Sequence, residues 1–316
     1  MTVGAVVVSF NSRQDLPACL GALSAARPRP QIVVVDNASA DGSAELVRDR
    51  FAGRVALLAL ERNTGFAGGC NRGLEALPGN VDVVAFLNPD VTVARDCLAR
   101  CAETLREDPG LAGVAPRLMR PDRRTVDSVG QGLRRWTLEV RDRGFGRPVD
   151  GELLQDRPVL AACGALAVYR REALAYAAVS GRAWSEELFC FWEDLELGWR
   201  LHNAGLAVRT CPEAVAVHRR GAGAPAGRGP LRWRRPPELE ACILTNRWIT
   251  LARHLHRLDL AARAPVLLAW DLMMTTLGIL RRPRLLPSIR RRWPLVVREW
   301  RSRGTRPRRR LRELPW

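Results

Sequence analysis

Four apolar runs, separated by helical patterns and polar turns, make up the first ninety residues of the chain. The run from Thr2 to Phe10 is the longest, and its β-branched composition is typical of strands that are buried on both faces of a parallel sheet. The other three runs cover residues 31–35, 55–60 and 81–87. Strands that alternate with helices over short connections predict an α/β fold with a doubly wound sheet, which binds ligands at the carboxyl ends of its strands.

A polar residue follows each of the first three runs, and these residues are Asn11, Asp36 and Asn63. A cap or a turn is the usual role of any one of them. Three successive strand ends of this kind are also compatible with a site for one nucleotide. The sequence GxGxxG is absent after the first run and no GK[ST] follows a glycine run, which argues against the common dinucleotide and P-loop sites. A glycine-rich turn over residues 62–73 leads into the next helix.

Carboxylates gather at two places that are far apart in the sequence. An Asn-Pro-Asp turn that ends with Asp90 closes the fourth run, and Glu193, Asp194 and Glu196 follow an aromatic pair ahead of a helical pattern. A carboxylate at a strand end suits a divalent cation whose other ligands are water or phosphate oxygens. A second carboxylate, not used by the metal, can take a proton from a hydroxyl group. An ordinary turn is the alternative interpretation of residues 88–90, because all three residue types favour turns.

Two single residues are further candidates. Gly164 interrupts an apolar run over residues 159–169, where we expect a bulge or the close approach of a ligand. His218 ends an apolar segment and precedes a glycine-rich loop. It is a candidate for a metal ligand or a contact to phosphate, and an ordinary polar residue at a strand end is the alternative.

The rest of the chain gives a coarser pattern of elements. After Asp90 we expect a helix as far as about Arg106, a strand over 111–118, loops that cover the site over 120–158, and a helix that ends near Gly205. Short apolar pieces follow at 208–211 and 215–218. Residues 264–280 are strongly apolar but carry Asp271 at their centre, so we expect a buried or interfacial helix there instead of one that crosses a membrane.

The positive charge is concentrated at the end of the chain. The protein has 316 residues and a net charge of +17, and residues 281–316 carry fourteen arginines and two glutamates, which leaves only +5 for residues 1–280. Trp293 and Trp300 lie among these arginines, a mixture that predicts binding to an anionic membrane surface. A solvated charge run is one alternative and a nucleic-acid-binding protein is another. The second would leave the carboxylates unexplained, and we expect no nucleic-acid partner.

The cysteines and the N-terminus indicate the compartment. None of the eight cysteines forms a CxxC pair, and no histidine has zinc-finger spacing, which argues against a structural zinc site. The N-terminus runs straight into a strand without a signal peptide. We therefore expect a reduced, cytoplasmic protein, peripheral at the inner face of the plasma membrane.

Seven stretches together, over about residues 1–221, resemble glycosyltransferase family two, the inverting enzymes of GT-A fold, and within it the rhamnosyltransferase-like branch from bacterial cell-surface polysaccharide synthesis. The resemblance rests on their order as much as on any single motif. In this order they are VVVSFNS, IVVVDNASADGS, RNTGFAGGCNRG, VAFLNPDV, CGALAVYRREAL, FCFWEDLELGWRLHNAG and HRRG.

The resemblance implies a role for each candidate residue. Asp194 would be the base that deprotonates the acceptor hydroxyl, with Glu193 beside it. Asp90 and His218 would hold Mg²⁺ or Mn²⁺ on the diphosphate. One departure concerns the metal, because the fullest family motif has two aspartates where this chain has Asn88 and Asp90. The nucleotide-sugar site would be formed by Phe10, Asn11, Asp36, Asn63, Gly65, Asn88 and Gly164.

The resemblance also implies how the chain is divided and what it binds. It predicts a mixed GT-A sheet flanked by helices over residues 1–221. The composition of the remaining residues predicts a flexible loop over 222–237 and a helical, arginine-rich region over 238–316. The implied donor is a nucleotide sugar such as dTDP-rhamnose, and the implied acceptor is a glycan or a polyprenyl-diphosphate-linked sugar. A non-catalytic binding module with the same fold is a further alternative.

Overall fold

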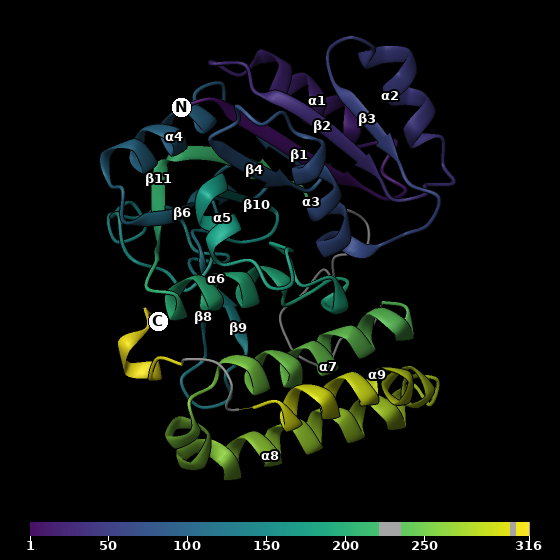
Figure 1. Cartoon of the computed structure of the whole chain (residues 1–316), viewed down its shortest axis with the longest axis vertical. Helices are drawn as coiled ribbons and strands as arrows, with labels where there is room; N and C mark the ends of the chain where they lie inside the picture. Colours follow the sequence, from purple (N-terminus) through teal and green to yellow (C-terminus); the bar gives the residue numbers. More distant parts are fainter. Residues whose placement is uncertain (221–234, 304–307, 316) are drawn as a thin grey trace.

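The computed structural model describes residues 1–220, 235–303 and 308–315, and one mixed sheet forms the centre of the upper part of the molecule (Figure 1). Half of this sheet is parallel, with β1 in register with β2 on one side and with β4 on the other. The predicted strands are all present, and their carboxyl ends lie at one edge. The order in this half is β3 (Ala56–Ala59), β2 (Gln31–Asp36), β1 (Val3–Ser9) and β4 (Val83–Leu87).

The other half of the sheet is mixed. β10 runs antiparallel to both β4 and β6, and β11 is parallel to β6 but antiparallel to the short β5. The result confirms the predicted mixed sheet. The order continues with β10 (Leu166–Arg170), β6 (Leu111–Met119), β11 (Ala207–His218) and β5 (Val91–Val93), while β7 (Val126–Ser128) pairs with β6, and β8 (Gln131–Leu133) pairs with β9 (Val140–Asp142) in a separate ribbon.

Helices cover both faces of the sheet, because successive strand side chains point to opposite sides. Ala5 and Val7 of β1 face one apolar cluster with α1 and α4, and Val6 and Val8 face a second cluster with α3 and α6. The helices are α1 (Leu16–Ala25), α2 (Ser43–Phe51), α3 (Gly65–Ala76), α4 (Cys97–Glu107), α5 (Arg171–Tyr176), α6 (Glu193–Asn203), α7 (Pro237–His254), α8 (Arg257–Arg281) and α9 (Leu285–Arg301), with short 3₁₀ turns at Glu186–Leu188 and Leu311–Glu313.

The glycine-rich stretch explains how closely α3 packs on the sheet. A Cβ atom on Gly73 would lie 2.1 Å from Val6 Cγ1, and one on Gly69 would lie 2.5 Å from Val8 Cγ1. Both distances are far below van der Waals contact. The glycines therefore bring the helix N-terminus down to the edge where β1 and β2 end.

Several predicted elements differ from the structure. The predicted helix directly after Asp90 is wrong in its first part, because β5 forms before α4 begins at Cys97. The apolar pieces 208–211 and 215–218 are one strand with a register shift, and the 159–169 run becomes a strand only from Leu166. Three short strands, β7 to β9, lie within the 120–158 segment, and the predicted loop over 222–237 falls mostly outside the described residues.

The basic C-terminal region folds against the rest of the chain as α7, α8 and α9, at the bottom of Figure 1. Many of its arginines form hydrogen bonds or ion pairs with other residues of the chain. Arg303 donates to the carbonyl of Leu251 at 3.0 Å, and Arg308 donates to that of Arg253 at 2.8 Å. Carboxylates bind others: Arg282 contacts Glu240, Arg298 contacts Glu299 and Glu187, and Arg310 contacts Asp259. The interpretation of the tail as a solvated charge run is therefore wrong for these residues.

The apolar helix α8 is more exposed than predicted. Its inward face holds Leu267 and Met274, and Asp271 on the same face accepts a hydrogen bond from Arg247 at 2.7 Å. The outward face carries Leu268, Leu272 and Leu280, each at least 70% exposed. Within the described residues α8 is the one helix that is long and apolar enough to cross a membrane, and only 17% of its most apolar window is buried. Of the two predicted alternatives, a buried or an interfacial helix, the exposed outward face argues against the buried one.

Candidate active site

The first centre of the site lies at the end of β4. The Asn88 amide donates to the Ala165 carbonyl at 3.1 Å, and the chain then turns through Asp90 into β5. Because β5 pairs antiparallel with β11, His218 stands opposite Val91. His218 Nε2 lies 3.4 Å from Asp90 Oδ1. The structure thus brings together the two residues predicted as metal ligands, which are 128 positions apart in the sequence.

A buried carboxylate, Asp127, stands behind His218. Its Oδ2 lies 2.8 Å from His218 Nδ1, and Arg220 binds its other oxygen. Burial alone would lower the pKa of His218, but the hydrogen bonds to Asp127 and Asp90 outweigh it and raise this pKa to about 9. Burial would raise the pKa of Asp127, and the contacts to His218 and Arg220 instead hold it below its usual value. Asp127, His218 and Asp90 thus form a row in which a protonated imidazole lies between two carboxylates.

This row continues towards Asp194. Arg220 donates to Asp142 at 3.2 Å, and Gln131 Nε2 donates to the other oxygen of Asp142 at 3.4 Å. The Gln131 side chain also acts to lower the pKa of Asp194, against the larger effect of burial. A continuous series of polar contacts therefore extends from Asp90 to Gln131, through His218, Asp127, Arg220 and Asp142.

Asp194 lies in the first turn of α6 and is half-buried. Its Oδ2 accepts the Gly164 amide at 2.8 Å, and its Oδ1 accepts the Leu195 amide at 2.8 Å. Burial raises the pKa of Asp194 by more than these two donors lower it. A Cβ atom on Gly164 would lie 3.2 Å from Asp194 Oδ2, so the glycine permits this approach. The close contact expected at Gly164 is thus one with a side chain of the protein.

The other two carboxylates of the cluster point elsewhere. Glu193 is buried, and burial together with the charge of Asp194 raises its pKa well above 4.5. Glu196 is fully buried and has three basic partners and a serine: Arg200 at 3.2 Å, His254 at 3.0 Å, Arg253 at 3.8 Å and Ser185 Oγ at 3.0 Å. Glu196 therefore fastens α6 to α7.

The turn before Asp194 has an unusual backbone. Phe189, Phe191 and Trp192 have φ values of 64°, 67° and 72°, in the left-handed region that bulky residues rarely adopt. Each such residue costs on the order of 1–3 kcal/mol, and conformations of this kind persist only where the surroundings hold them. We call residues 188–192 the aromatic turn. It separates the 3₁₀ turn at Glu186–Leu188 from α6, and it contacts α3 because the Phe189 carbonyl accepts the Ala67 amide at 3.2 Å.

The nucleotide-site candidates lie at the ends of β1 and β2 and at the start of α3. Asn11 Oδ1 accepts the Ala40 amide at 2.9 Å, and Asn63 Oδ1 accepts the Gly65 amide at 2.8 Å, so both side chains stabilise local turns. Gly65 has φ +75° and a Cβ atom there would lie 2.3 Å from the Phe189 carbonyl oxygen, which links this edge to the aromatic turn.

At the same edge, Asp36 has an unsatisfied carboxylate oxygen and Phe10 has an exposed side chain. Asp36 Oδ2 accepts the Ser39 amide at 2.9 Å, while its buried Oδ1 has no hydrogen-bond partner among the described residues. The Phe10 ring is 49% exposed. An unsatisfied carboxylate oxygen and an exposed ring at a strand edge are groups that can receive a nucleoside.

Sequence reasoning missed four polar residues of this region: Asn37, Asp127, Gln131 and Asp142. Asn37 Oδ1 accepts from both the amide and the hydroxyl of Thr64, and its Nδ2 donates to the Gly65 carbonyl at 2.9 Å. It stands directly after Asp36, so its position at a strand end was a usable signal. The other three lie in the 120–158 segment, which was predicted only to cover the site and has no apolar periodicity to locate them.

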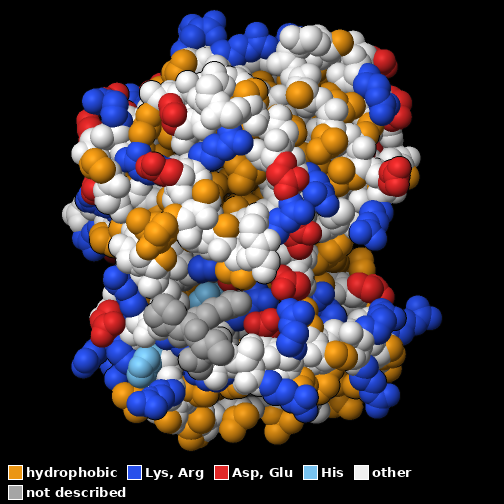
Figure 2. Space-filling view, viewed as in Figure 1, with side chains coloured by type: hydrophobic (Ala, Val, Ile, Leu, Met, Phe, Trp, Pro, Cys, Tyr) orange, Lys and Arg blue, Asp and Glu red, His pale blue; other side chains and the backbone are white. Residues whose placement is uncertain are grey.

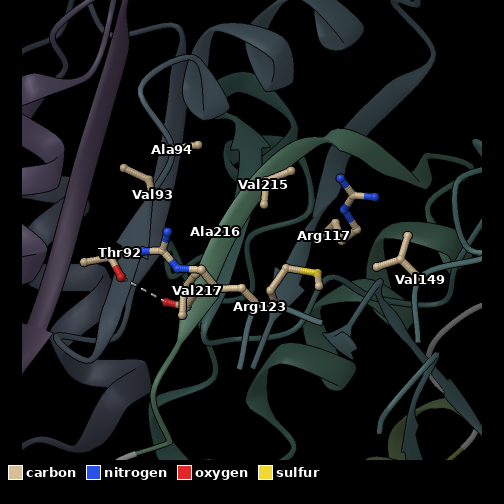
Figure 3. A pocket seen from close by; sticks show the side chains of 10 residues that line it. Thr92, Val93, Ala94, Arg117, Arg123, Val149, Val215, Ala216 and Val217 are labelled. Atoms are coloured by element: carbon tan, nitrogen blue, oxygen red, sulfur yellow. Dashed lines mark hydrogen bonds between the residues drawn. The ribbon is translucent and has the colours of Figure 1, made fainter. Parts of the chain in front are cut away.

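A separate cavity of about 400 Å³ lies beside β11 and contains none of the predicted site residues. Val215 and Val217 of β11 line it, with Arg117 and Arg123 towards its two sides, and Thr92 donates to the Val217 carbonyl at 3.4 Å (Figure 3). His218 is adjacent in sequence, but its side chain contacts Asp90 and Asp127 instead.

The fold and the two carboxylate centres define a GT-A glycosyltransferase, and comparisons with known proteins agree. The family model described as glycosyl transferase family 2 matches residues 5–176, more than half of the chain. The protein therefore belongs to glycosyl transferase family 2, and it is a glycosyltransferase, as its sequence predicted.

Two curated proteins show the similarity at the sequence level. The chain is 26% identical over 240 residues to an N-acetylglucosaminyl-diphospho-decaprenol L-rhamnosyltransferase of Mycobacterium tuberculosis, a match that covers 67% of this chain and 74% of that protein. It is 37% identical over 99 residues to the succinoglycan biosynthesis protein ExoO of Rhizobium meliloti, covering 31% of this chain and 28% of the other.

Two solved structures show the same fold. The mannosyltransferase PcManGT of Pyrobaculum calidifontis, in complex with GDP-Man and Mn²⁺, has a TM-score of 0.53 at 18% identity and covers 96% of this chain and 76% of its own. GalNAc-T7 with UDP, GalNAc and Mn²⁺ has a TM-score of 0.59 at 15% identity over 80% of this chain. This chain spans about half, 48%, of the GalNAc-T7 chain.

Proposed function

We propose that the protein transfers a sugar with inversion from a nucleotide donor to a hydroxyl group, with Asp194 as the base. The carrying observation is that the turn before Asp90 and the Asp194 side chain bind adjacent residues, Ala165 and Gly164, because transfer needs a diphosphate-binding group and a base at the same substrate. The acceptor oxygen attacks the anomeric carbon as the bond from that carbon to the diphosphate oxygen breaks. The hydroxyl proton passes to Asp194, and the nucleoside diphosphate leaves.

The environments of the two adjacent carboxyls support this assignment. Glu193 is buried, and burial together with the charge of Asp194 raises its pKa, so a second charge beside Asp194 is unfavourable. Asp194 is half-buried and its position is fixed by two backbone amides. General base catalysis by such a group contributes roughly 10²–10⁴-fold to the rate.

Asp90 and His218 are the residues that would hold a divalent cation, Mg²⁺ or Mn²⁺. The donor set fits, because a carboxylate oxygen and an imidazole nitrogen converge, and Asp127 binds the opposite ring nitrogen as carboxylates do behind metal-bound histidines. The cation would replace the proton on His218. Bound there, it supplies Lewis-acid stabilisation of the leaving diphosphate. Manganese in the structures of GalNAc-T7 and PcManGT supports this proposal.

The donor site that we propose lies along the strand ends. Asp36 and Phe10 face the nucleoside with a spare carboxylate oxygen and a ring, Asn11, Asn63 and Gly65 shape the surrounding turns, and Asn88 and Gly164 lie nearer the sugar. The name of the Mycobacterium relative supports L-rhamnose, from dTDP-rhamnose, as the sugar, and a polyprenyl-diphosphate-linked sugar as the acceptor. The names of both curated relatives support a role in cell-surface polysaccharide synthesis.

We further propose that α8 rests on the inner face of the plasma membrane and so brings the site to a lipid-linked acceptor. Leu268, Leu272 and Leu280 follow one another at multiples of four residues and form an outward apolar stripe, and hydrophobic side chains line this rim of the molecule in Figure 2. Asp271 lies on the inward face, so its charge does not oppose this contact. All eight cysteines are free, which supports a reduced compartment.

A donor screen tests the transfer. Wild type and Asp194→Asn are incubated with a panel of nucleotide sugars and lipid-linked or soluble acceptors, with and without manganese, and release of nucleoside diphosphate is measured. We expect acceptor-dependent release by the wild type with manganese and its loss in the variant. Failure of every donor with every acceptor would contradict the proposal.

Liposome flotation tests the membrane contact. We expect Leu268→Glu combined with Leu272→Glu to lose binding to vesicles that contain anionic lipid. Leu154→Glu is the matched control, because Leu154 is 44% exposed but lies in the segment between β9 and β10. If the double variant floats as well as the wild type, α8 is not the contact surface.

A further inference from the structure

We propose that Asn246 of α7 is a positioning residue for the catalytic base, because its side-chain amide holds the aromatic turn from which α6 and Asp194 begin. This inference rests on the proposed role of Asp194. It assigns to the basic C-terminal region a part in catalysis that is separate from any contact with a membrane.

Asn246 makes an unusual set of contacts. It is fully buried, and its Nδ2 donates to the carbonyls of Leu188 at 2.7 Å, Cys190 at 2.9 Å and Phe191 at 2.8 Å. An amide nitrogen has two hydrogens, so three acceptors around it share them. One side chain thus satisfies three backbone carbonyls within four consecutive residues.

The aromatic turn needs this partner. Its left-handed residues interrupt regular hydrogen bonding, and buried carbonyl groups must find donors elsewhere. A backbone in the left-handed region at Phe189, Phe191 and Trp192 is retained only where contacts hold it. Asn246 provides those contacts from a residue more than fifty positions further along the chain.

The aromatic turn also determines where α6 begins. The Trp192 carbonyl accepts the Glu196 amide at 2.8 Å, which closes the first helical turn, and Asp194 lies within that turn. Any relaxation of residues 188–192 therefore moves the base relative to Gly164 and to the substrate. A displacement of about 1 Å can cost roughly 10²-fold in rate.

Arg292 of α9 fixes the orientation of Asn246. Its guanidinium donates to Asn246 Oδ1 at 2.5 Å, to Thr245 Oγ1 at 2.7 Å and to the Glu187 carbonyl at 3.0 Å. Because an arginine can only donate, the amide oxygen must face it and the NH₂ group must face the turn. An arginine of the basic tail thereby acts on the active site through one intermediate side chain.

The isosteric variant Asn246→Asp distinguishes a role of Asn246 in holding the aromatic turn from a role in filling space in the core. It keeps the oxygen that receives Arg292 but replaces the NH₂ donor with an oxygen that faces three carbonyls. Asn246→Ala removes both groups. Asn203→Ala is the matched control, because Asn203 also connects α6 to the C-terminal region, through His254 and the Arg309 amide, without touching the turn.

Two measurements on the full-length variants test the proposal. We expect kcat to fall about 10²-fold in Asn246→Asp and Asn246→Ala while the KM for the donor stays within about twofold, because the strand-end donor site is untouched. In amide hydrogen exchange we expect residues 188–195 to exchange faster in both variants and the β1, β2 and β4 amides to be unchanged. Asn203→Ala should match the wild type in both measurements.

The outcomes distinguish this inference from the proposed function. An Asn246→Asp protein with wild-type kcat and wild-type exchange at residues 188–195 would overturn the positioning role. A loss that spreads to the sheet amides, or a kcat loss equal to that of Asn203→Ala, would also overturn it and indicate general destabilisation. If the wild type turns over no donor, the proposed function fails, and the exchange measurement alone decides whether Asn246 holds the turn.

Discussion

The two carboxylate centres of this enzyme are built in different ways. Asp90 stands where a central strand ends, and the pairing of β5 with β11 gives it His218 as a neighbour. Asp194 follows a turn with three left-handed aromatic residues, which depends on contacts from α7 and α9. The sheet alone positions the first centre, whereas the C-terminal helices are needed to position the second.

The difference matters because the proposed mechanism gives the two centres different tasks. A group that binds diphosphate works at a fixed edge, where strand ends already converge. A base must meet the acceptor hydroxyl at hydrogen-bond distance, which demands closer positioning. In this chain the base is also the centre that is attached to the helices nearest the proposed membrane surface. Variants that perturb each centre separately show whether the sheet positions the first centre and the C-terminal helices position the second.

The largest expected effect is that of Asp194→Asn. We expect kcat to fall by roughly 10²–10⁴-fold because the base is lost. The free energy of unfolding should fall by only about 0.5–1.5 kcal/mol, because asparagine has one oxygen for the two backbone amides that the two oxygens of Asp194 accept. Steady-state kinetics and thermal unfolding measure the two effects, with Asp150→Asn as control, because its side chain is 43% exposed and lies outside the site. Retained activity would assign the proton transfer to another group.

Removing the attachment of α6 to α7 tests whether the second centre depends on the C-terminal region. Glu196→Gln leaves Arg200 and Arg253 buried without their carboxylate, so we expect a loss of about 3–5 kcal/mol in the free energy of unfolding. The exposed pair of Glu45 with Arg48 is the control, and Glu45→Gln should cost at most about 0.5 kcal/mol.

The pH dependence of the same variant gives a second measurement. Burial would raise the pKa of Glu196, but Arg200 and His254 hold it far below 4.5. A lowered folded-state pKa contributes stability above pH 4.5 that is lost as the pH falls. Chemical denaturation at several pH values should therefore show the difference between wild type and Glu196→Gln narrowing in acid. A constant difference would mean that the charge of Glu196 is not the cause.

Sequence patterns named both residues of the first centre, although they did not show that the two residues lie together. Apolar runs identified β1, β2, β3 and β4, and the polar residues at their ends marked the edge at which the candidates gather. Asp90 and His218 could be named because each ends an apolar segment. Their proximity could not be derived from the pattern, because β5 is only three residues long and was hidden within a predicted helix.

The second centre could be named but not constructed from the sequence. Acidic residues before a helical pattern pointed to Asp194, yet nothing local indicates that Asn246 and Arg292 hold the preceding turn. Both lie in helical patterns where a polar residue is ordinarily a surface residue. The basic tail was likewise assigned to a membrane surface because tryptophans lie among its arginines, and the structure shows that several of these arginines donate to carbonyls of the protein itself.

A smaller effect is expected at the strand edge. Asn63→Ala removes the acceptor for the Gly65 amide at 2.8 Å, which should cost about 0.5–1.5 kcal/mol in the free energy of unfolding. Because Gly65 belongs to the proposed donor site, we expect a weaker donor affinity with little change in kcat. Calorimetric titration with nucleoside diphosphate and denaturant unfolding measure these quantities. An unchanged affinity would show that this turn does not shape the donor site.

The smallest expected effect concerns Asp142, which lies between the two centres. Its negative charge raises the pKa of Asp194, and Gln131 and Arg220 donate to it. Asp142→Asn removes the charge but keeps an oxygen for Gln131, so the pKa of Asp194 should fall. The base then stays deprotonated to lower pH, and the acidic limb of the kcat profile should move in that direction. If the acidic limb stays in place in Asp142→Asn, as it should in the control Asp150→Asn, the charge of Asp142 does not affect the titration of Asp194.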